Sequence, residues 1–275
     1  MAEIIVSSQN PQYKNLKKLV ESSGARREQQ QTVLDGEHLL QAYLQSGNVP
    51  RLLIVEESAV EPPLLAQWRH VPAMQLTPRL FSALSPVKTP TGVMALIDIP
   101  AVKQRQTSSF IVLLERIQDP GNLGAMLRSA AAAGADAVYL SEGCADAWSP
   151  KVLRGGMGAH FATQIIEQAD LVGVARDFSG KTCCAALAAP QSLYDVDLSS
   201  AVAFAVGNEG AGLSPELRAA ADIEFSIPMP GNVESLNAAA ALAVCAFERV
   251  RQISGTIVKP FVSNDRAGAS PQDDI

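Results

Sequence analysis

The chain has 275 residues, of which 47% are hydrophobic and 18% are charged, a composition that predicts a globular protein with a sizeable core. No apolar run approaches the roughly 20 residues of a membrane-spanning helix, and no basic stretch followed by an apolar one opens the chain, so we expect a soluble, cytosolic protein. The formal net charge of −6 argues against a simple nucleic-acid coat protein.

Residues 1–100 have the pattern of a small α/β unit. Asn10 and Pro11 predict the start of a helix that ends near Ser22, and Thr77 with Pro78 predicts the start of another. The other predicted elements are a strand at 32–34, a helix at 37–45, strands at 51–55 and 93–99, and a helix starting near Pro62.

Basic residues are concentrated in this first part of the chain. Residues 1–110 contain 11 Lys and Arg against 9 Asp and Glu, whereas residues 111–275 contain 11 against 19. Between residues 7 and 27 a single acid, Glu21, accompanies five bases, namely Lys14, Lys17, Lys18, Arg26 and Arg27. A local basic patch can bind phosphate even on an acidic protein, and the alternative is a solvated face of an amphipathic helix.

Residues 101–109 are polar and lack periodicity, which predicts a linker between domains, and the last twenty residues, 256–275, predict a flexible tail. From residue 110 onward, short apolar runs alternate with helical stretches. The runs fall at 110–114, 137–140, 163–166, 182–188, 201–206 and 223–227. Strands of this kind predict a mostly parallel sheet that is covered by helices on both faces.

Three polar, glycine-rich segments lie between predicted strands and helices in this second part. They span residues 118–124, 207–212 and 228–237. Loops that leave the strand ends of one α/β sheet converge on one crevice, and such crevices bind ligands. We therefore expect one composite site for a polar ligand, built largely from backbone.

The first segment leads into a helix for which Asn122 is the predicted N-cap, and which ends before Gly134. Arg128 lies in this helix, and its neighbours at three and four positions are the small residues Gly124, Ala125, Ala131 and Ala132. Such a stripe leaves the guanidinium free to reach past the helix, or lets another backbone pack closely. A guanidinium suits a phosphate, and the alternative for Arg128 is a surface ion pair.

The second segment has three glycines in six residues, which permit close approach of the backbone to a ligand. Its one charge, Glu209, could orient a hydroxyl, face a cationic ligand, or remain a solvated loop acid, since Ser214 and Pro215 start the next helix without it. The third segment ends at Ser235, a predicted N-cap for an alanine-rich helix that we expect under the sheet or at a subunit interface.

Several common signatures are missing. The glycine loops match neither the dinucleotide-binding nor the P-loop pattern, and no G-x-S-x-G occurs. The four cysteines form no C-x-x-C pair and the three histidines are scattered, so we predict no metal site and reduced, partly buried thiols.

Together the three segments resemble the SpoU (TrmH-type) ribose methyltransferases of the SPOUT class. The resemblance covers residues 110–252 and follows the family's three motifs in order. The matching positions are Asn122 and Arg128; Gly207 to Gly210 with Gly212 and Leu213; and Ile227 to Met229 with Ser235 to Asn237. Residues 1–100 are similar to the accompanying substrate-binding domain, an α/β fold like that of an RNA-binding ribosomal protein, which agrees with the basic patch.

The resemblance implies a fold and a cofactor. Residues 110–255 would form a trefoil-knotted α/β domain, an exception to the rule that chains avoid knots. The protein would be a homodimer with its last helix near the interface, and would methylate a 2′-hydroxyl of RNA. It would bind S-adenosylmethionine through backbone at the cofactor-binding candidates Gly207, Gly212, Ile227, Met229 and Leu236. The five bases of the first part would contact the RNA.

The resemblance also assigns catalytic candidates, whose chemistry can be examined. Arg128 would act on the 2′-oxygen; because a guanidinium stays protonated, we expect it to stabilise the developing alkoxide and a neighbouring phosphate rather than act as a general base. The proton would leave through that phosphate or a water. The residues expected to orient Arg128 and the ribose are Asn122, Glu209, Ser235 and Asn237.

The extra N-terminal domain favours rRNA over tRNA as the substrate, because tRNA members of the family typically lack it. The alternatives are the same reaction on tRNA, an RNA-binding factor without catalysis, and a different α/β nucleotide enzyme. The complete set of catalytic candidates disfavours the second of these, and the missing phosphate-loop signatures disfavour the third.

Overall fold

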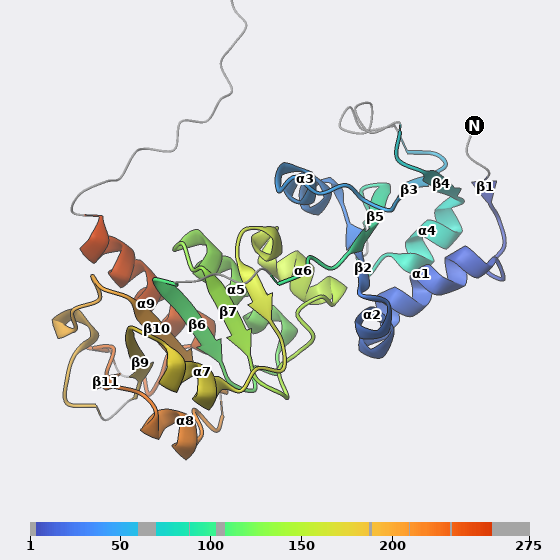
Figure 1. The fold of residues 1–275 in the computed structure, drawn as a ribbon. Helices are drawn as coiled ribbons and strands as arrows, with labels where there is room; N and C mark the ends of the chain where they lie inside the picture. The colour runs from blue at the N-terminus through green and yellow to red at the C-terminus, as the bar shows by residue number, and fades with distance from the viewer. Residues whose placement is uncertain are drawn as a thin grey trace, which may run out of the picture.

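The computed structural model describes residues 4–59, 70–87, 89–102, 108–186, 189–208, 210–231 and 233–254. Figure 1 shows an N-terminal unit and a C-terminal unit side by side, each built on its own sheet. The helix predicted near Pro62, most of the predicted linker, the predicted tail and Glu209 lie outside the described residues. Among the described residues, no helix is both long enough and apolar enough to span a membrane.

The N-terminal unit holds a mixed, five-stranded sheet in the order β1-β4-β3-β5-β2. Strand β5 runs antiparallel to β2 and β3, whereas β4 runs parallel to β3 and β1. The predicted strands at 32–34, 51–55 and 93–99 are confirmed, while two short strands were not predicted. The bounds are β1 Ile4–Ile5, β2 Gln31–Asp35, β3 Leu52–Glu56, β4 Ala73–Leu76 and β5 Val93–Asp98.

Four described helices accompany this sheet: α1 Pro11–Glu21, α2 Ser23–Gln29, α3 Glu37–Gln45 and α4 Pro78–Leu84. Asn10 caps α1 as predicted, because its side chain accepts hydrogen bonds from the backbone N–H groups of Gln12 and Tyr13. Helix α1 stops at Ser22 because that residue caps α2 through the N–H of Ala25. The chain therefore turns between Lys18 and the two arginines that follow.

The C-terminal unit holds a six-stranded sheet in the order β11-β9-β10-β6-β7-β8, and every pairing in it is parallel. The prediction of a parallel sheet is thus confirmed. The strands are β6 Phe110–Leu114, β7 Ala137–Leu140, β8 Gln164–Ile166, β9 Lys181–Ala185, β10 Val202–Val206 and β11 Ile223–Phe225. Strands β9 and β11 end two or more residues before the last residue of the apolar runs that predicted them.

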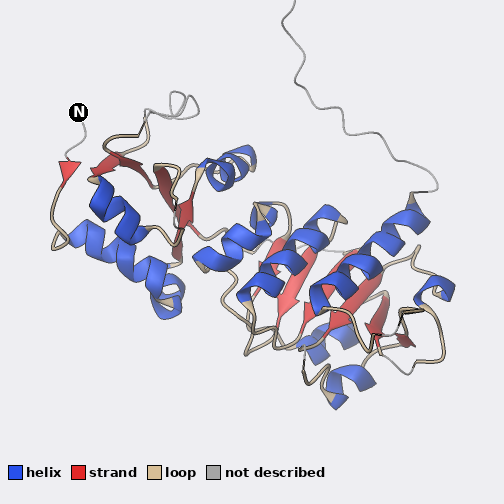
Figure 2. Ribbon diagram, turned by 180° about the vertical axis from the view of Figure 1, so that it is seen from behind, coloured by secondary structure: helices blue, strands red, loops and turns tan. Residues whose placement is uncertain are grey.

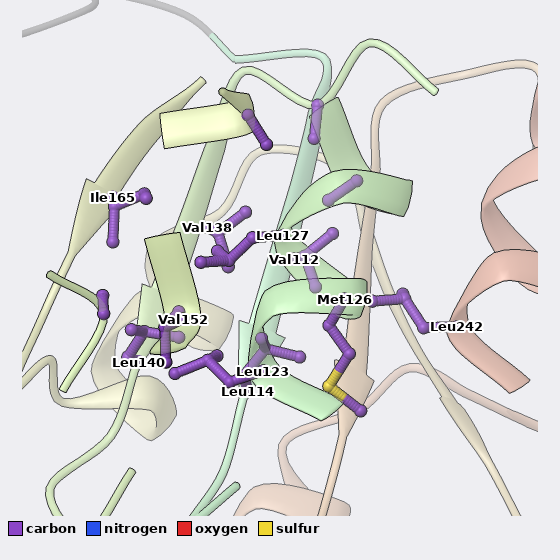
Figure 3. Packing of buried hydrophobic residues seen from close by; sticks show 14 of the residues in the cluster. Val112, Leu114, Leu123, Met126, Leu127, Val138, Leu140, Val152, Ile165 and Leu242 are labelled. Atoms are coloured by element: carbon purple, nitrogen blue, oxygen red, sulfur yellow. The ribbon is translucent and has the colours of Figure 1, made fainter. Parts of the chain in front are cut away.

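Helices cover both faces of this sheet, as predicted (Figure 2). On one face, the side chains of Val112 and Leu114 pack against Leu123 and Leu127 of α5, and Met126 reaches Leu242 of α9 (Figure 3). On the other face, Ile111 and its neighbours pack against α7 and α8. The helices are α5 Pro120–Ala132, α6 Pro150–Gly156, α7 Leu171–Asp177, α8 Pro215–Ala219 and α9 Ala238–Ile253, with 3-10 helices at Ala159–Phe161 and Leu193–Asp195.

Two predicted helix caps are wrong, and both differ for a local reason. Helix α5 is capped by Asp119, whose carboxylate accepts from the N–H of Asn122 at 2.8 Å, because Pro120 fits the first helical position, where no N–H is needed. Helix α9 is capped by Asn237 rather than by Ser235. The two asparagine side chains are consequently placed at the starts of their helices, where they can meet.

Candidate active site

A cavity of about 380 Å³ lies where β9, β10 and β11 end and α9 begins. It is lined by all five predicted cofactor-binding residues, and by Ser235 and Asn237. Mostly aromatic and aliphatic side chains complete its walls. They are Ala185, Ala186, Phe204, Ala205, Val206, Asn208, Leu213, Phe225, Ala238, Ala241 and Cys245. The second and third glycine-rich segments therefore meet, as the sequence predicts for loops at strand ends.

The second segment can fold into this wall because it lacks side chains where its backbone doubles back. A Cβ atom on Gly207 would lie 2.2 Å from the carbonyl carbon of Gly212, and Gly212 itself has a φ of 68°. The side chain of Asn208 holds the turn closed, since its Oδ1 accepts from the N–H groups of Gly210 at 2.9 Å and Ala211 at 3.1 Å. The glycines are thus a steric requirement of the loop.

The end of β6 fixes the same loop from the other side. The Nδ2 of Asn208 donates to the carbonyl oxygen of Arg116 at 3.0 Å, and Glu115 Oε2 accepts from the N–H of Ser214 at 2.6 Å. Arg116 adopts a left-handed backbone with a φ of 53°. Asn208 was predicted only as a position of the second segment and its motif, without a role of its own, and Glu115 was not predicted. The polar residue that directly follows a buried strand was the signal that could have found Glu115.

The first segment is joined to the cavity wall by a contact between two asparagine side chains. Asn237 Nδ2 donates to Asn122 Oδ1 at 3.0 Å, while Asn237 Oδ1 accepts from the N–H of Ala239 at 2.9 Å. Asn122 does not itself line the cavity. This contact joins the starts of α5 and α9, and so brings the first motif beside the third.

Arg128 lies farther along α5, exposed to solvent and outside the cavity lining. Of the small residues near it, Gly124 packs against another helix, one of the two roles considered for this stripe. A Cβ atom on Gly124 would lie 2.8 Å from the Cα atom of Gly155 in α6. The backbones of α5 and α6 thus touch, which holds the helix that bears Asn122 and Arg128 in place.

The buried cysteines remain protonated at neutral pH. Burial is the main cause that raises the pKa of Cys183 and Cys245 to about 12 and that of Cys184 to about 11. At neutral pH all three are neutral thiols, and no cysteine in the described part of the chain forms a disulfide. Within the described residues, no cluster of His, Cys, Asp or Glu could hold a metal ion.

Four of the five predicted basic contacts are exposed: Lys14, Lys17 and Lys18 on α1, and Arg27 on α2. Arg26 is different, because only 4% of it is exposed and it pairs with Asp146 of the C-terminal unit at 2.6 Å. The prediction that Arg26 belongs to an exposed patch is therefore wrong. At Ser22 the chain changes direction into α2, and Arg26 of this helix points into the protein.

Both parts of the chain match known protein families. Residues 109–247 match the SpoU rRNA Methylase family, and residues 10–95 match the MRM3-like substrate binding domain. The chain belongs to the SpoU family. It is therefore an RNA methyltransferase by family, and the resemblance drawn from the three motifs is confirmed.

Relatives of the same kind span nearly the whole chain. The 23S rRNA (guanosine(2553)-2′-O)-methyltransferase RlmP of Bacillus subtilis is 33% identical over 246 residues, which cover 88% of this chain and 97% of that protein. The AdoMet-bound rRNA methyltransferase from Sinorhizobium meliloti has a TM-score of 0.80 at 26% identity, covering 92% of this chain and 98% of that one. The SpoU methyltransferase AviRb from Streptomyces viridochromogenes, in complex with AdoMet, has a TM-score of 0.77 at 26% identity, covering 88% and 98%.

Proposed function

We propose that this protein transfers a methyl group from S-adenosylmethionine to a ribose 2′-hydroxyl of rRNA, with the large-subunit RNA as the favoured substrate. The observation that carries the proposal is the meeting of Asn122 and Asn237 beside a cavity whose rim holds Gly207 and Leu236. This contact supports a site that two separate family motifs share. The names of the relatives and the N-terminal match favour rRNA over tRNA.

The cavity suits the cofactor. Its volume lies in the range of small-molecule sites, its walls include Phe204 and Phe225, and the glycine loop lines it at Gly207 and Gly212. S-adenosylmethionine, when bound, supplies an electrophilic methyl group on a sulfonium centre. In this proposal Gly207, Gly212, Ile227, Met229 and Leu236 hold it.

The chain's own residues would then position and stabilise the reacting ribose. Arg128 stabilises the charge that develops on the 2′-oxygen and binds an adjacent phosphate, and that phosphate or a water accepts the proton. Asn122, Ser235 and Asn237 orient the ribose and Arg128, together with Glu209. Positioning of this kind supplies much of the rate enhancement, because a methyl group on a sulfonium centre is already electrophilic.

The finer features of the family complete the proposal. Residues 110–255 form a trefoil-knotted methyltransferase domain after a linker at 101–109, and residues 1–100 bind RNA as a ribosomal-protein-like unit. The protein acts in the cytoplasm as a homodimer. Phe247 and Ile253 support a dimer contact at α9, because they expose 49% and 40% of their surface despite being apolar.

The variant Arg128→Ala tests the catalytic role. We expect methyl transfer to rRNA to fall by about 100-fold or more, because a preorganised cation that stabilises the developing charge is lost. Calorimetry should show cofactor affinity within about twofold of wild type, since Arg128 is outside the cavity lining. Arg218→Ala, which removes an exposed arginine paired with Glu224, is the matched control. Equal losses of binding and transfer would contradict the role.

The substrate needs its own experiment. Mapping of 2′-O-methyl groups in rRNA and tRNA from cells with and without the protein should reveal a site in the large-subunit rRNA that depends on it. A dependent site in tRNA alone would assign the same chemistry to the other substrate.

A further inference from the structure

The contact between the two units is centred on one buried arginine. The side chain of Arg26 is 5% exposed and that of Asp146 is 11% exposed. Nε and Nη2 of Arg26 both donate to Asp146 Oδ2, at 2.8 and 2.6 Å, and Nη1 donates to the carbonyl oxygens of Leu19 and Val20. Arg26 therefore ties the end of α1 to the C-terminal unit with four hydrogen bonds.

Asp146 belongs to a segment that is itself immobilised from several sides. Asp146 Oδ1 accepts from the N–H of Trp148 at 2.9 Å. The N–H of Ala147 donates to Glu167 Oε1 at 3.1 Å, and its carbonyl oxygen accepts from His160 Nε2 at 2.8 Å. From the N-terminal unit, Thr32 Oγ1 donates to the carbonyl oxygen of Trp148 at 2.8 Å. Residues 146–148 are thus a rigid segment that both units hold.

This segment continues directly into the helix layer that carries the first motif. Ser149 caps α6, and α6 lies against both β2 of the N-terminal unit and α5 of the C-terminal unit. The contact of Gly155 with Gly124 leaves α6 no room to shift on α5. A path of tight contacts therefore runs from α1, through Arg26 and α6, to the helix that bears Asn122 and Arg128.

We propose that Arg26 and Asp146 are positioning residues that set the basic face of α1 in register with Arg128, so that RNA held by the N-terminal unit presents its ribose at the cavity. The proposal rests on the proposed function. It gives Arg26 a role other than phosphate binding, because its guanidinium is committed to Asp146 and to the two carbonyl groups.

Three variants and a control test this coupling: Arg26→Gln, Asp146→Asn, the double variant and Arg51→Gln. The control breaks the Arg51–Asp98 pair, which has the same 2.6 Å length but is 63% and 47% exposed. With an rRNA substrate, we expect each single variant to lower kcat by about 10- to 100-fold, since a small misplacement of the reacting groups has such an effect. The double variant should be no slower than the slower single variant, because both remove one shared contact.

Two equilibrium measurements separate positioning from binding. Dissociation constants for RNA and for S-adenosylmethionine should stay within about twofold of wild type, because neither ligand touches the pair in this proposal. The rate of backbone hydrogen exchange should rise in residues 146–156 of Arg26→Gln. It should not rise in β10, which does not take part in the contact between the units. Arg51→Gln should leave all of these values unchanged. If Arg26→Gln unfolds, Arg26→Lys, which keeps a cation without the fork of donors, should show an intermediate kcat.

The results that would overturn the inference differ from those that would overturn the proposed function. Unchanged kcat in both single variants would show that the contact does not position the substrate. Weaker RNA binding in Arg26→Gln, matching its loss of kcat/KM while Asp146→Asn stays active, would make Arg26 a direct RNA ligand. A wild-type protein that methylates no RNA would instead reject the proposed function, whatever the exchange data show.

Discussion

The cavity and the contact between the units are built in opposite ways. The cavity wall is made of loops whose backbones approach closely because side chains are absent, as at Gly207 and Gly212. The contact between the units is made of large buried side chains, among them Arg26 and Trp148, and of Tyr43 packed edge-on against Phe161 with 5.1 Å between ring centres. Added bulk should therefore harm the cavity, whereas lost side-chain groups should harm the contact between the units.

The largest effect is expected from Gly207→Ala. The added methyl group would collide with the backbone of Gly212 and reshape the cavity wall. We expect cofactor affinity to fall by about 100-fold or more, to be measured by calorimetry, because several backbone contacts would be lost together. Gly210→Ala is the matched control, since its Cβ would meet only Asn208 Oδ1 at 3.5 Å. Similar losses in both variants would show that the loop tolerates no change, rather than that one contact matters.

A smaller effect is expected from pH, and it arises at the contact between the units. Burial lowers the pKa of His160 to about 4 from an ordinary value of 6.5, although the carbonyl of Ala147 and the charge of Asp146 act against it. Because the unfolded chain takes up a proton below about pH 6.5 and the native His160 does not, the stability that the neutral ring contributes is complete above that pH. It is lost as the pH falls toward about 4.

The loss should amount to about 2 kcal/mol in unfolding free energy between about pH 7.5 and pH 5. Denaturant unfolding at the two pH values, for wild type and for His160→Gln, measures it. The glutamine amide can still donate to the carbonyl of Ala147 but does not titrate, so the variant should lose less stability than wild type on acidification. Equal losses in both proteins would place the acid sensitivity elsewhere.

The smallest effect separates the two functions of Asn237. Asn237→Ala removes the cap of α9 and should lower stability by about 1 kcal/mol, seen as a drop in Tm. Asn237→Asp keeps the acceptor for the helix N–H groups but removes the donor to Asn122. It should therefore keep its Tm and lose about tenfold in methyl transfer, as expected for a misoriented group. An active Asn237→Asp would show that the contact with Asn122 is dispensable.

The position of the cavity could be predicted from the sequence because the patterns that indicate it are short segments of the chain. Each strand that ends in a glycine-rich segment predicts a loop at the same edge of a parallel sheet, and this needs no knowledge of distant partners. The cap of α5 was misplaced by three residues and that of α9 by two, because Asp119 and Asn237 compete with equally plausible polar neighbours. Local patterns therefore predict the presence of a helix or strand more accurately than its first and last residues.

The contact between the units could not be predicted in this way. Arg26 lies 120 residues from Asp146, and a basic residue among lysines is typical of a solvent-exposed surface. Only the turn at Ser22, where one helix ends and another begins, decides that Arg26 points inward while Lys18 does not. The identity of a buried ion pair thus depends on tertiary structure that no short pattern contains.

The backbone contact between Gly124 and Gly155 has a consequence for how such a protein can vary. Gly124 has no space for a methyl group, and a methyl group on Gly155 would lie only 3.2 Å from the Cα atom of Gly124. A comprehensive mutational scan should therefore find Gly124 the less tolerant of the two, although neither lines the cavity. Sequence changes in α5 and α6 are then confined to the faces of these helices that do not contact each other. Variants selected for new RNA targets should accumulate changes there and in the N-terminal unit, while the seam between α5 and α6 stays the same.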